Sequence, residues 1–192
     1  MLRSTLIVLL LSVSLALAGP SLPQGPQAKQ PVPTPLPYAP FLGQWSGGLE
    51  YRDFRSDERV YLPTWLEVVP SADNRSLEFH YIYDDGPNKI VQETSRVTID
   101  PEHQTFTVLS DGDKTAETYQ MEGLPKFYEK LAGVLVLKGS GTENDKKVDV
   151  RITIKIGKNY YRYEKQTRLP GGDFQFRDAY TFTRREPPQI AH

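Results

Sequence analysis

The sequence predicts an all-β protein: a single antiparallel up-and-down β-barrel of about ten strands. Three observations support this. Apolar and polar residues alternate with a period of two from Phe41 to Arg184. The alternating runs are separated by short turn-forming segments, and only residues 124–131 have a helical pattern. Because each strand has one apolar face and an open sheet leaves edges unpaired, the pattern favours closure into a barrel.

The expected strands follow one another through short connections. In chain order they span residues 44–53, 59–69, 76–83, 89–99, 105–110, 116–121, 134–137, 148–156, 160–168 and 174–184. The connections are rich in Gly, Pro, Asn and Asp, which favour tight turns. Alternation predicts that the Val and Ile residues of 148–156 share one buried face. In the last strand the expected apolar face is interrupted by Asp178 and comprises Phe174, Phe176, Tyr180 and Phe182.

The regions outside the expected barrel differ from it in composition. Residues 1–18 combine Arg3 with an apolar run and end in small residues, which is typical of a secretory signal peptide cleaved after Ala18. Residues 19–40 contain eight of the 16 prolines and predict an extended, disordered linker. A polyproline ligand for a protein partner is the alternative interpretation of this segment. We expect a lipocalin-like domain over 41–185, a disordered tail over 186–192, and a secreted or periplasmic protein without a transmembrane anchor.

Composition excludes several classes of function. The 23 basic and 24 acidic residues give a net charge of −1, which provides no electrostatic basis for binding nucleic acid. Without cysteine there is no disulfide, thiolate nucleophile or cysteine-ligated metal. Export of a fold that needs no disulfide favours a bacterial envelope or secreted protein.

Residues 41–47, Phe-Leu-Gly-Gln-Trp-Ser-Gly, resemble the Gly-x-Trp opening of the calycins, which comprise lipocalins, fatty-acid-binding proteins and nitrobindin-like barrels. Residues 41–184 as a whole are similar to bacterial exported lipocalin-like proteins of uncharacterised function. The resemblance implies that Trp45 closes one end of the barrel and that Arg184 of the last strand packs on it.

Two ligand sites of these relatives do not transfer. The carboxylate-binding Arg-x-Tyr pair has no match, because Arg177 and Tyr180 are three residues apart and are expected on opposite faces. The haem-binding histidine near the C-terminus is missing from the expected last strand. We therefore expect no haem, no other cofactor and no metal.

Aromatic side chains are the best candidates for a binding site. Tyrosine in a cavity combines an apolar ring with one directional hydroxyl, which suits a small amphipathic ligand. The expected lumen residues are Trp65, Phe79, Tyr81, Tyr83, Tyr161, Tyr163 and Phe182. The alternative, that these aromatics simply fill the core, is equally compatible with the sequence.

The other polar candidates have simpler interpretations. His80 shares a strand face with Glu78 and is expected on the outside if Phe79, Tyr81 and Tyr83 point inward. The paired acids at 84–85 and at 111 and 113 are interpreted as turn formers, and residues 139–142 as a flexible loop. No residue is predicted to be catalytic.

Three functions remain open at this level. The leading hypothesis is an exported non-enzymatic protein that holds a small hydrophobic or amphipathic molecule in the barrel lumen. The second is an envelope interaction or structural protein with a solid barrel. The third is a barrel enzyme of haem-dependent or isomerase type that uses His80.

Overall fold

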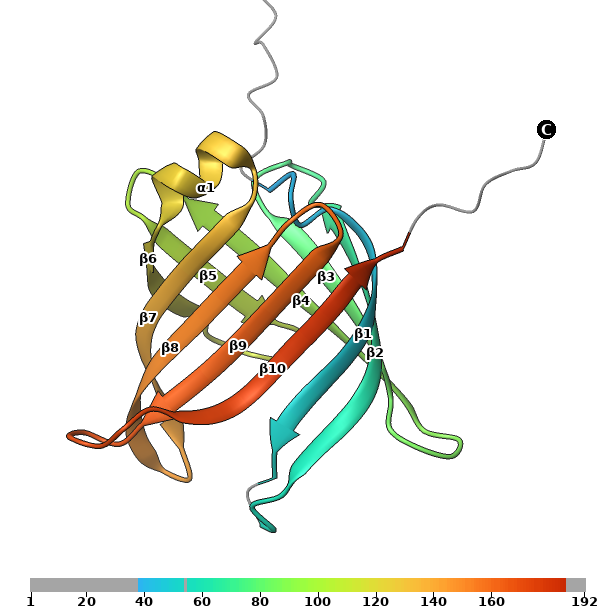
Figure 1. The fold of residues 1–192 in the computed structure, drawn as a ribbon, viewed down its shortest axis with the longest axis vertical. Helices are drawn as coiled ribbons and strands as arrows, with labels where there is room; N and C mark the ends of the chain where they lie inside the picture. Colours follow the sequence, from blue (N-terminus) through green and yellow to red (C-terminus); the bar gives the residue numbers. More distant parts are fainter. Residues whose placement is uncertain (1–37, 54, 186–192) are drawn as a thin grey trace, which may run out of the picture. The chain divides into compact units, whose positions relative to one another are not determined.

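The computed structural model describes residues 38–53 and 55–185, and these form ten strands and one short helix. The strands make one closed antiparallel barrel (Figure 1), which confirms the predicted fold class. The expected signal peptide, most of the expected linker and the whole of the expected tail lie outside the described residues. Within the described residues, no helix has the length and hydrophobicity required to cross a membrane.

The strand bounds agree closely with the alternation in the sequence. The elements are β1 (Gly43–Arg52), β2 (Arg59–Pro70), β3 (Leu77–Asp84), β4 (Ile90–Asp100), β5 (Thr105–Ser110), β6 (Glu117–Glu122), α1 (Leu124–Lys130), β7 (Gly133–Glu143), β8 (Lys146–Ile156), β9 (Tyr160–Arg168) and β10 (Gln175–Arg184). Each strand pairs with the next, and β10 pairs with β1, where Trp45 lies opposite Arg184 and Tyr51 opposite Asp178. Closure therefore pairs both edges of every described strand.

The β7–β8 hairpin is longer than the sequence pattern indicated. Residues 139–142, expected as a flexible loop, are part of β7 and pair with β8. The turn comprises only Asn144 and Asp145, both with positive φ (48° and 61°), which is the geometry of a two-residue hairpin turn. Glycine is required at position 139 of the strand, because a Cβ there would lie 2.7 Å from the ring of Tyr119. Gly139 thus reflects close packing beside an aromatic ring, whereas Gly141 lies beside Val150.

A β-bulge in β10 changes which side chains face the lumen. The register with β9 shifts between Phe176 and Asp178, so Arg177 is the extra residue. The expectation that Phe174 and Phe176 face inward is therefore wrong. Both rings lie on the outside, where the Arg59 guanidinium is 3.9 Å from the centre of the Phe176 ring and that of Arg151 is 4.1 Å from the Phe174 ring.

One end of the barrel is filled by large apolar side chains. The buried cluster at this end includes Tyr38, Phe41, Trp45, Leu124 and Phe127, and α1 lies over it (Figure 1). The Tyr38 hydroxyl donates to the carbonyl oxygen of Arg75 at 2.9 Å. Residues 38–40, expected at the end of the disordered linker, are thus part of the domain, because the Tyr38 ring is buried and its hydroxyl donates a hydrogen bond to the barrel.

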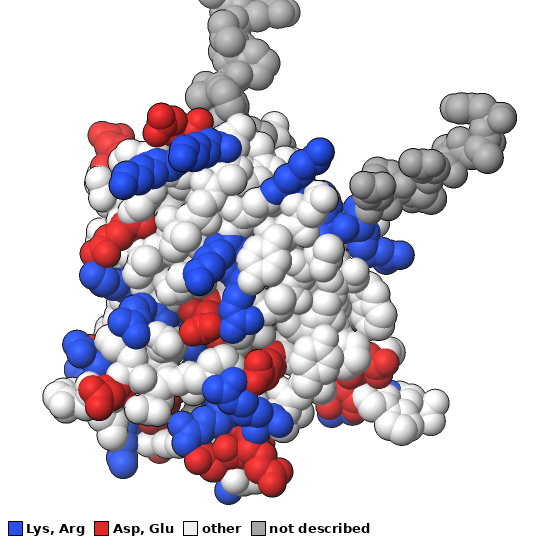
Figure 2. All heavy atoms as spheres, in the orientation of Figure 1, with Lys and Arg blue, Asp and Glu red and all other residues white. Residues whose placement is uncertain are grey.

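The outer surface carries interspersed charges of both signs (Figure 2). Across β6–β9 these charges form ion pairs between adjacent positions: Lys138 with Glu122 at 2.7 Å, Arg162 with Glu164 at 2.7 Å, and Arg168 with Asp149 at 2.9 Å. Exposed pairs of this kind each contribute about 0–1 kcal/mol to stability. The stability of the barrel therefore comes mainly from its interior and its closed hydrogen-bond ladder.

Candidate functional site

A cavity of about 150 Å³ lies inside the barrel. Along β10 the inward positions run from Asp178 near the open end through Tyr180 to Phe182 and Arg184 at the filled end. Tyr180 lines the cavity, and Phe182 is buried beyond it. The lining residues are Phe79, Tyr81, Glu93, Ser95, Val97, Phe106, Val108, Ser110, Glu117, Tyr161, Tyr163 and Tyr180.

Strand alternation places this lining. The contributing positions are every second residue of β3, β4, β5, β9 and β10, with Glu117 from β6. The four lining tyrosines come from β3, β9 and β10, whereas β4 and β5 supply serine and valine side chains together with Glu93 and Phe106. The cavity exists because Ser95, Val97, Val108 and Ser110 are too short to meet the tyrosine rings across the lumen.

The tyrosine rings contact one another around the cavity. Tyr81 and Tyr83 are stacked, with ring centres 5.9 Å apart and planes 8° apart. Tyr180 lies 5.2 Å from Tyr81 and 5.9 Å from Tyr163, and its plane meets that of Tyr163 at 69°. Such offset and edge-to-face pairs stabilise a fixed arrangement. The rings therefore form a preorganised wall with a near-perpendicular corner.

Hydroxyl groups connect the tyrosines to a carboxylate. The Tyr83 hydroxyl donates to Glu93 Oε2 at 3.3 Å and lies 2.9 Å from the Tyr180 hydroxyl. A hydroxyl has one proton, so Tyr180 must be the donor to Tyr83. On another part of the wall, Tyr119 donates to Glu117 Oε2 at 2.5 Å. Both carboxylates are thus positioned by tyrosine hydroxyls.

Burial keeps the tyrosines protonated. It raises the pKa of Tyr81, Tyr163 and Tyr180 well above the ordinary tyrosine value, because the phenolate would lose its hydration. It also raises the pKa of Tyr83. At physiological pH these groups are neutral hydroxyls that can donate and accept hydrogen bonds.

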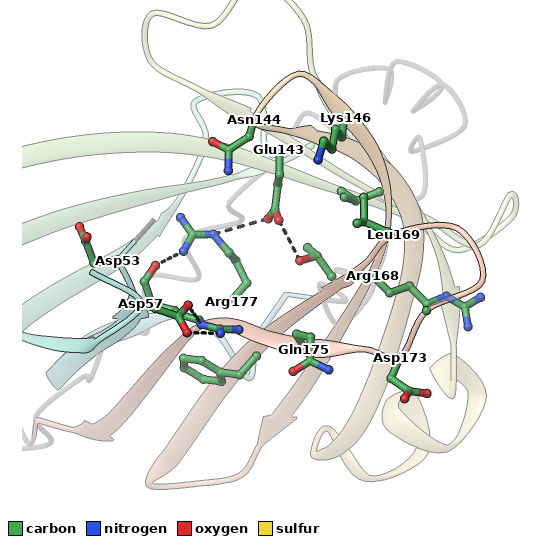
Figure 3. Close-up of a pocket in the computed structure, with 15 residues that line it drawn as sticks. Asp53, Asp57, Glu143, Asn144, Lys146, Arg168, Leu169, Asp173, Gln175 and Arg177 are labelled. Carbon is green, nitrogen blue, oxygen red and sulfur yellow. Dashed lines mark hydrogen bonds and ion pairs between the residues drawn. The ribbon is translucent and has the colours of Figure 1, made fainter. Parts of the chain in front are cut away.

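The open end of the barrel contains a larger hollow of about 480 Å³ (Figure 3). Arg177, the bulge residue, donates to the carbonyl of Arg52 and lies 3.5 Å from the Glu143 carboxylate. Glu143 also accepts a hydrogen bond from Thr167 at 2.9 Å, and Arg52 pairs with Asp57. Basic and acidic side chains therefore balance at this mouth.

Asp178 lies between the mouth and the tyrosine wall. Burial raises its pKa to about 6, while Lys165 on β9 and Arg177 partly oppose the shift. Lys165 is directly opposite Asp178 in the β9–β10 register. The negative charge of Asp178 below the cavity is thus partly compensated by Lys165 and Arg177.

At the filled end, the Arg184 guanidinium lies 4.0 Å from the centre of the Trp45 ring. It donates to the carbonyl of Pro40 at 2.9 Å and also to the carbonyl of Leu42. The Trp45 ring is fully buried, and its Nε1 donates to the Phe41 carbonyl at 2.8 Å. That Trp45 and Arg184 close this end of the barrel stays a prediction. The observed contact between them is the geometry that such a role requires.

The seven expected lumen residues divide into three groups. Four of them line the cavity: Phe79, Tyr81, Tyr161 and Tyr163. Tyr83 and Phe182 are buried inside the barrel and pack on Tyr180. Trp65 is wrongly placed by the prediction: it lies on the outer face with 38% of its surface exposed, because its neighbours Thr64 and Leu66 occupy the inward positions of β2.

Sequence reasoning missed the polar part of the lining. Ser95 and Ser110 lie on the alternating inward positions of β4 and β5, and Glu93 and Glu117 are in phase with the inward faces of β4 and β6 but exposed to solvent. The alternation in the sequence already indicated these positions, because Val97 and Ile99 continue the same strand face as Glu93 and Ser95. Polar residues at positions in phase with an apolar face mark a lumen that is not completely filled.

His80 lies on the outer face of β3, hydrogen-bonded to Thr94 at 3.2 Å and near Glu78. It therefore cannot take part in chemistry inside the lumen. Among residues 38–53 and 55–185, no cluster of three or more His, Asp or Glu side chains is arranged to hold a metal ion.

No protein-family model matches the sequence, and no curated protein matches it. Among solved structures, the chain is similar to the S-type phycobiliprotein lyase CPES from Guillardia theta. The TM-score is 0.54 with 9% identity, over 79% of this chain and 92% of that chain. The domain has a calycin-like fold. At this identity the likeness concerns the fold alone, and the relation to bacterial exported proteins stays a prediction.

Proposed function

We propose that this protein is an exported binding protein whose calycin-like barrel holds a small amphipathic molecule in the cavity beside Tyr81, Tyr163 and Tyr180. The observation that carries the proposal is the cavity itself. Apolar side chains fill the Trp45 end of the barrel, yet a space of about 150 Å³ remains at the tyrosine wall. A solid barrel would have closed this space, because close packing is the rule for protein interiors.

Cavity size limits the ligand. A dry cavity of about 150 Å³ accommodates a molecule the size of benzene. The present cavity has the same volume. We therefore expect a ligand with a single ring or a comparably small branched skeleton.

The lining favours a molecule with both an apolar and a polar part. Phe79, Val97, Phe106 and Val108 offer apolar contact, whereas the tyrosine hydroxyls and two serines offer hydrogen bonds. Ser95 and Ser110 lie 3.1 Å apart through their hydroxyls. A purely aliphatic ligand would leave these groups without new partners, so an amphipathic ligand fits better.

Export rests on the sequence of residues 1–18, and the proline-rich segment suits a tether. The lyase named among the similar structures supports the barrel as a ligand-binding fold, and its own reaction is a property of that protein. The proposal concerns binding alone.

Native mass spectrometry of the protein purified from its own host tests the proposal. Val108→Trp places a large side chain in the cavity, whereas Leu109→Trp, one position along, places the same side chain on the outer face. We expect wild type and Leu109→Trp to carry a small non-covalent adduct that Val108→Trp lacks. Absence of an adduct from wild type, or its retention by Val108→Trp, would overturn the proposal.

A further inference from the structure

We infer that the ligand of the tyrosine-lined cavity is a small organic cation, such as a protonated amine, an inference that rests on the proposed function of the lumen. Three features of the structure carry it: the sign of the ionisable groups on the wall, their lack of compensation, and the arrangement of the aromatic rings.

The carboxylates on the cavity wall are Glu93 and Glu117, and the described lining residues include no lysine or arginine. Each carboxylate accepts a hydrogen bond from a tyrosine, Tyr83 and Tyr119 respectively. A neutral hydroxyl orients a carboxylate without neutralising it. Both glutamates are exposed to solvent, so the cavity presents this negative charge where it opens to solvent.

Two basic side chains, Arg177 and Lys165, belong to the open half of the barrel. Arg177 pairs with Glu143 at 3.5 Å, and Lys165 faces Asp178 across the β9–β10 register. Glu93 and Glu117 take part in none of the ion pairs formed among the described residues. Glu93 and Glu117 are exposed to solvent at the edge of the cavity and have no basic partner among these ion pairs, and an incoming cation would supply one.

The aromatic rings suit the same ligand. Tyr180 and Tyr163 meet at 69°, and Tyr81 lies 5.2 Å from Tyr180, so several ring planes of different orientation surround one small space. Ring faces attract cations through the aromatic quadrupole, and cages of this kind recognise ammonium groups. A carboxylate ligand would meet both the negative faces of the rings and the two glutamates.

Isothermal titration calorimetry with three single-ring probes tests the inference at neutral pH: benzylamine as the cation, benzyl alcohol as the neutral analogue and benzoate as the anion. We expect benzylamine to bind about tenfold or more tightly than benzyl alcohol, and benzoate to bind most weakly. Glu93→Gln and Glu117→Gln should each weaken benzylamine about tenfold and leave benzyl alcohol unchanged.

Glu102→Gln, in the exposed turn before β5, is the matched control and should change nothing. Equal or tighter binding of benzyl alcohol or benzoate would overturn the cation inference while leaving a lumen-binding protein in place. Absence of binding by all three probes would also overturn it, and the adduct experiment with Val108→Trp then judges the binding function separately. Benzylamine binding that persists in Glu93→Gln/Glu117→Gln would contradict the role of the carboxylates.

Discussion

The Arg184 guanidinium lies over the Trp45 ring, 4.0 Å from its centre, and joins the last strand of the barrel to the first. The two residues are opposite one another in the β1–β10 register, so the contact forms where the barrel closes. Gly43 leaves room for it, since a Cβ there would lie 2.8 Å from Arg184 Nη1. The cation–π contact and the hydrogen bonds of Arg184 to the Pro40 and Leu42 carbonyls thus lie where β10 meets β1.

Replacing Arg184 should weaken this closure. Arg184→Met keeps the aliphatic stem but removes the charge over Trp45 and the donors to the Pro40 and Leu42 carbonyls, so we expect a loss of about 2–3 kcal/mol in the free energy of unfolding. Urea titration followed by Trp45 fluorescence measures it. Arg185→Met, at the exposed next position, is the control. Equal losses in the two variants would show that Arg184 has no special role.

The hydroxyl chain predicts an order of two similar substitutions. Tyr83→Phe leaves the Tyr180 hydroxyl without its acceptor inside the barrel, whereas Tyr180→Phe leaves Tyr83 still bonded to Glu93. We expect Tyr83→Phe to cost about 1–3 kcal/mol and Tyr180→Phe about 0.5–1.5 kcal/mol. Chemical denaturation checks the order, and the reverse order would contradict the assigned direction of donation.

Asp178 predicts a pH dependence of stability. Its pKa is raised to about 6 in the folded protein from the ordinary value of 3.8, so the folded state holds a proton that the unfolded state has lost between these values. Its contribution to the free energy of unfolding is thus favourable at low pH and falls as the pH rises through this window, by on the order of 2–3 kcal/mol.

Asp178→Asn removes this titration. We expect the variant to be more stable than wild type near pH 8 and the difference to shrink toward about pH 4. Thermal or urea denaturation at both pH values measures it, with Asp173→Asn in the exposed β9–β10 loop as control. A difference that is the same at both pH values would argue against a raised Asp178 pKa.

The β7–β8 turn offers a test of the backbone geometry. Asp145 has a φ of 61° in a two-residue turn between Glu143↔Lys146 partners. Asp145→Gly should raise the free energy of unfolding by about 0.5–1 kcal/mol, because Asn-Gly suits this turn best. Asp145→Val should lower it by about 1–2 kcal/mol, because a β-branched residue resists positive φ. Similar stabilities for the two variants would contradict the turn type.

Much of the fold could be predicted from the sequence, because strand period and turn residues are local signals. The alternation of Val148, Val150 and Ile152 and the turn residues between strands led to ten strands and one short helix, and the structure has both. Residues 139–142 were misinterpreted because consecutive small residues suit either a loop or a strand packed against a large ring. Only the partner strand, with Tyr119 beside Gly139, distinguishes the two.

The site was less predictable, because it depends on long-range relationships. The bulge at Arg177 reverses the faces of β10, and no local signal separates Phe176, which is outside, from Tyr180, which is inside. Trp65 was predicted to face the lumen, although the alternation of its strand neighbours places it on the outer face. The cavity depends on how far short residues such as Ser95 fall from the tyrosines opposite, a distance that no local pattern contains.

A crystal structure of the protein purified from its own host is the most direct test of the central claim. The account predicts ligand density in the cavity beside Tyr81, Tyr163 and Tyr180, with its polar group directed toward Glu93 or Glu117. A lumen closed completely by protein side chains at this level would contradict it and favour a solid barrel that acts through its outer surface.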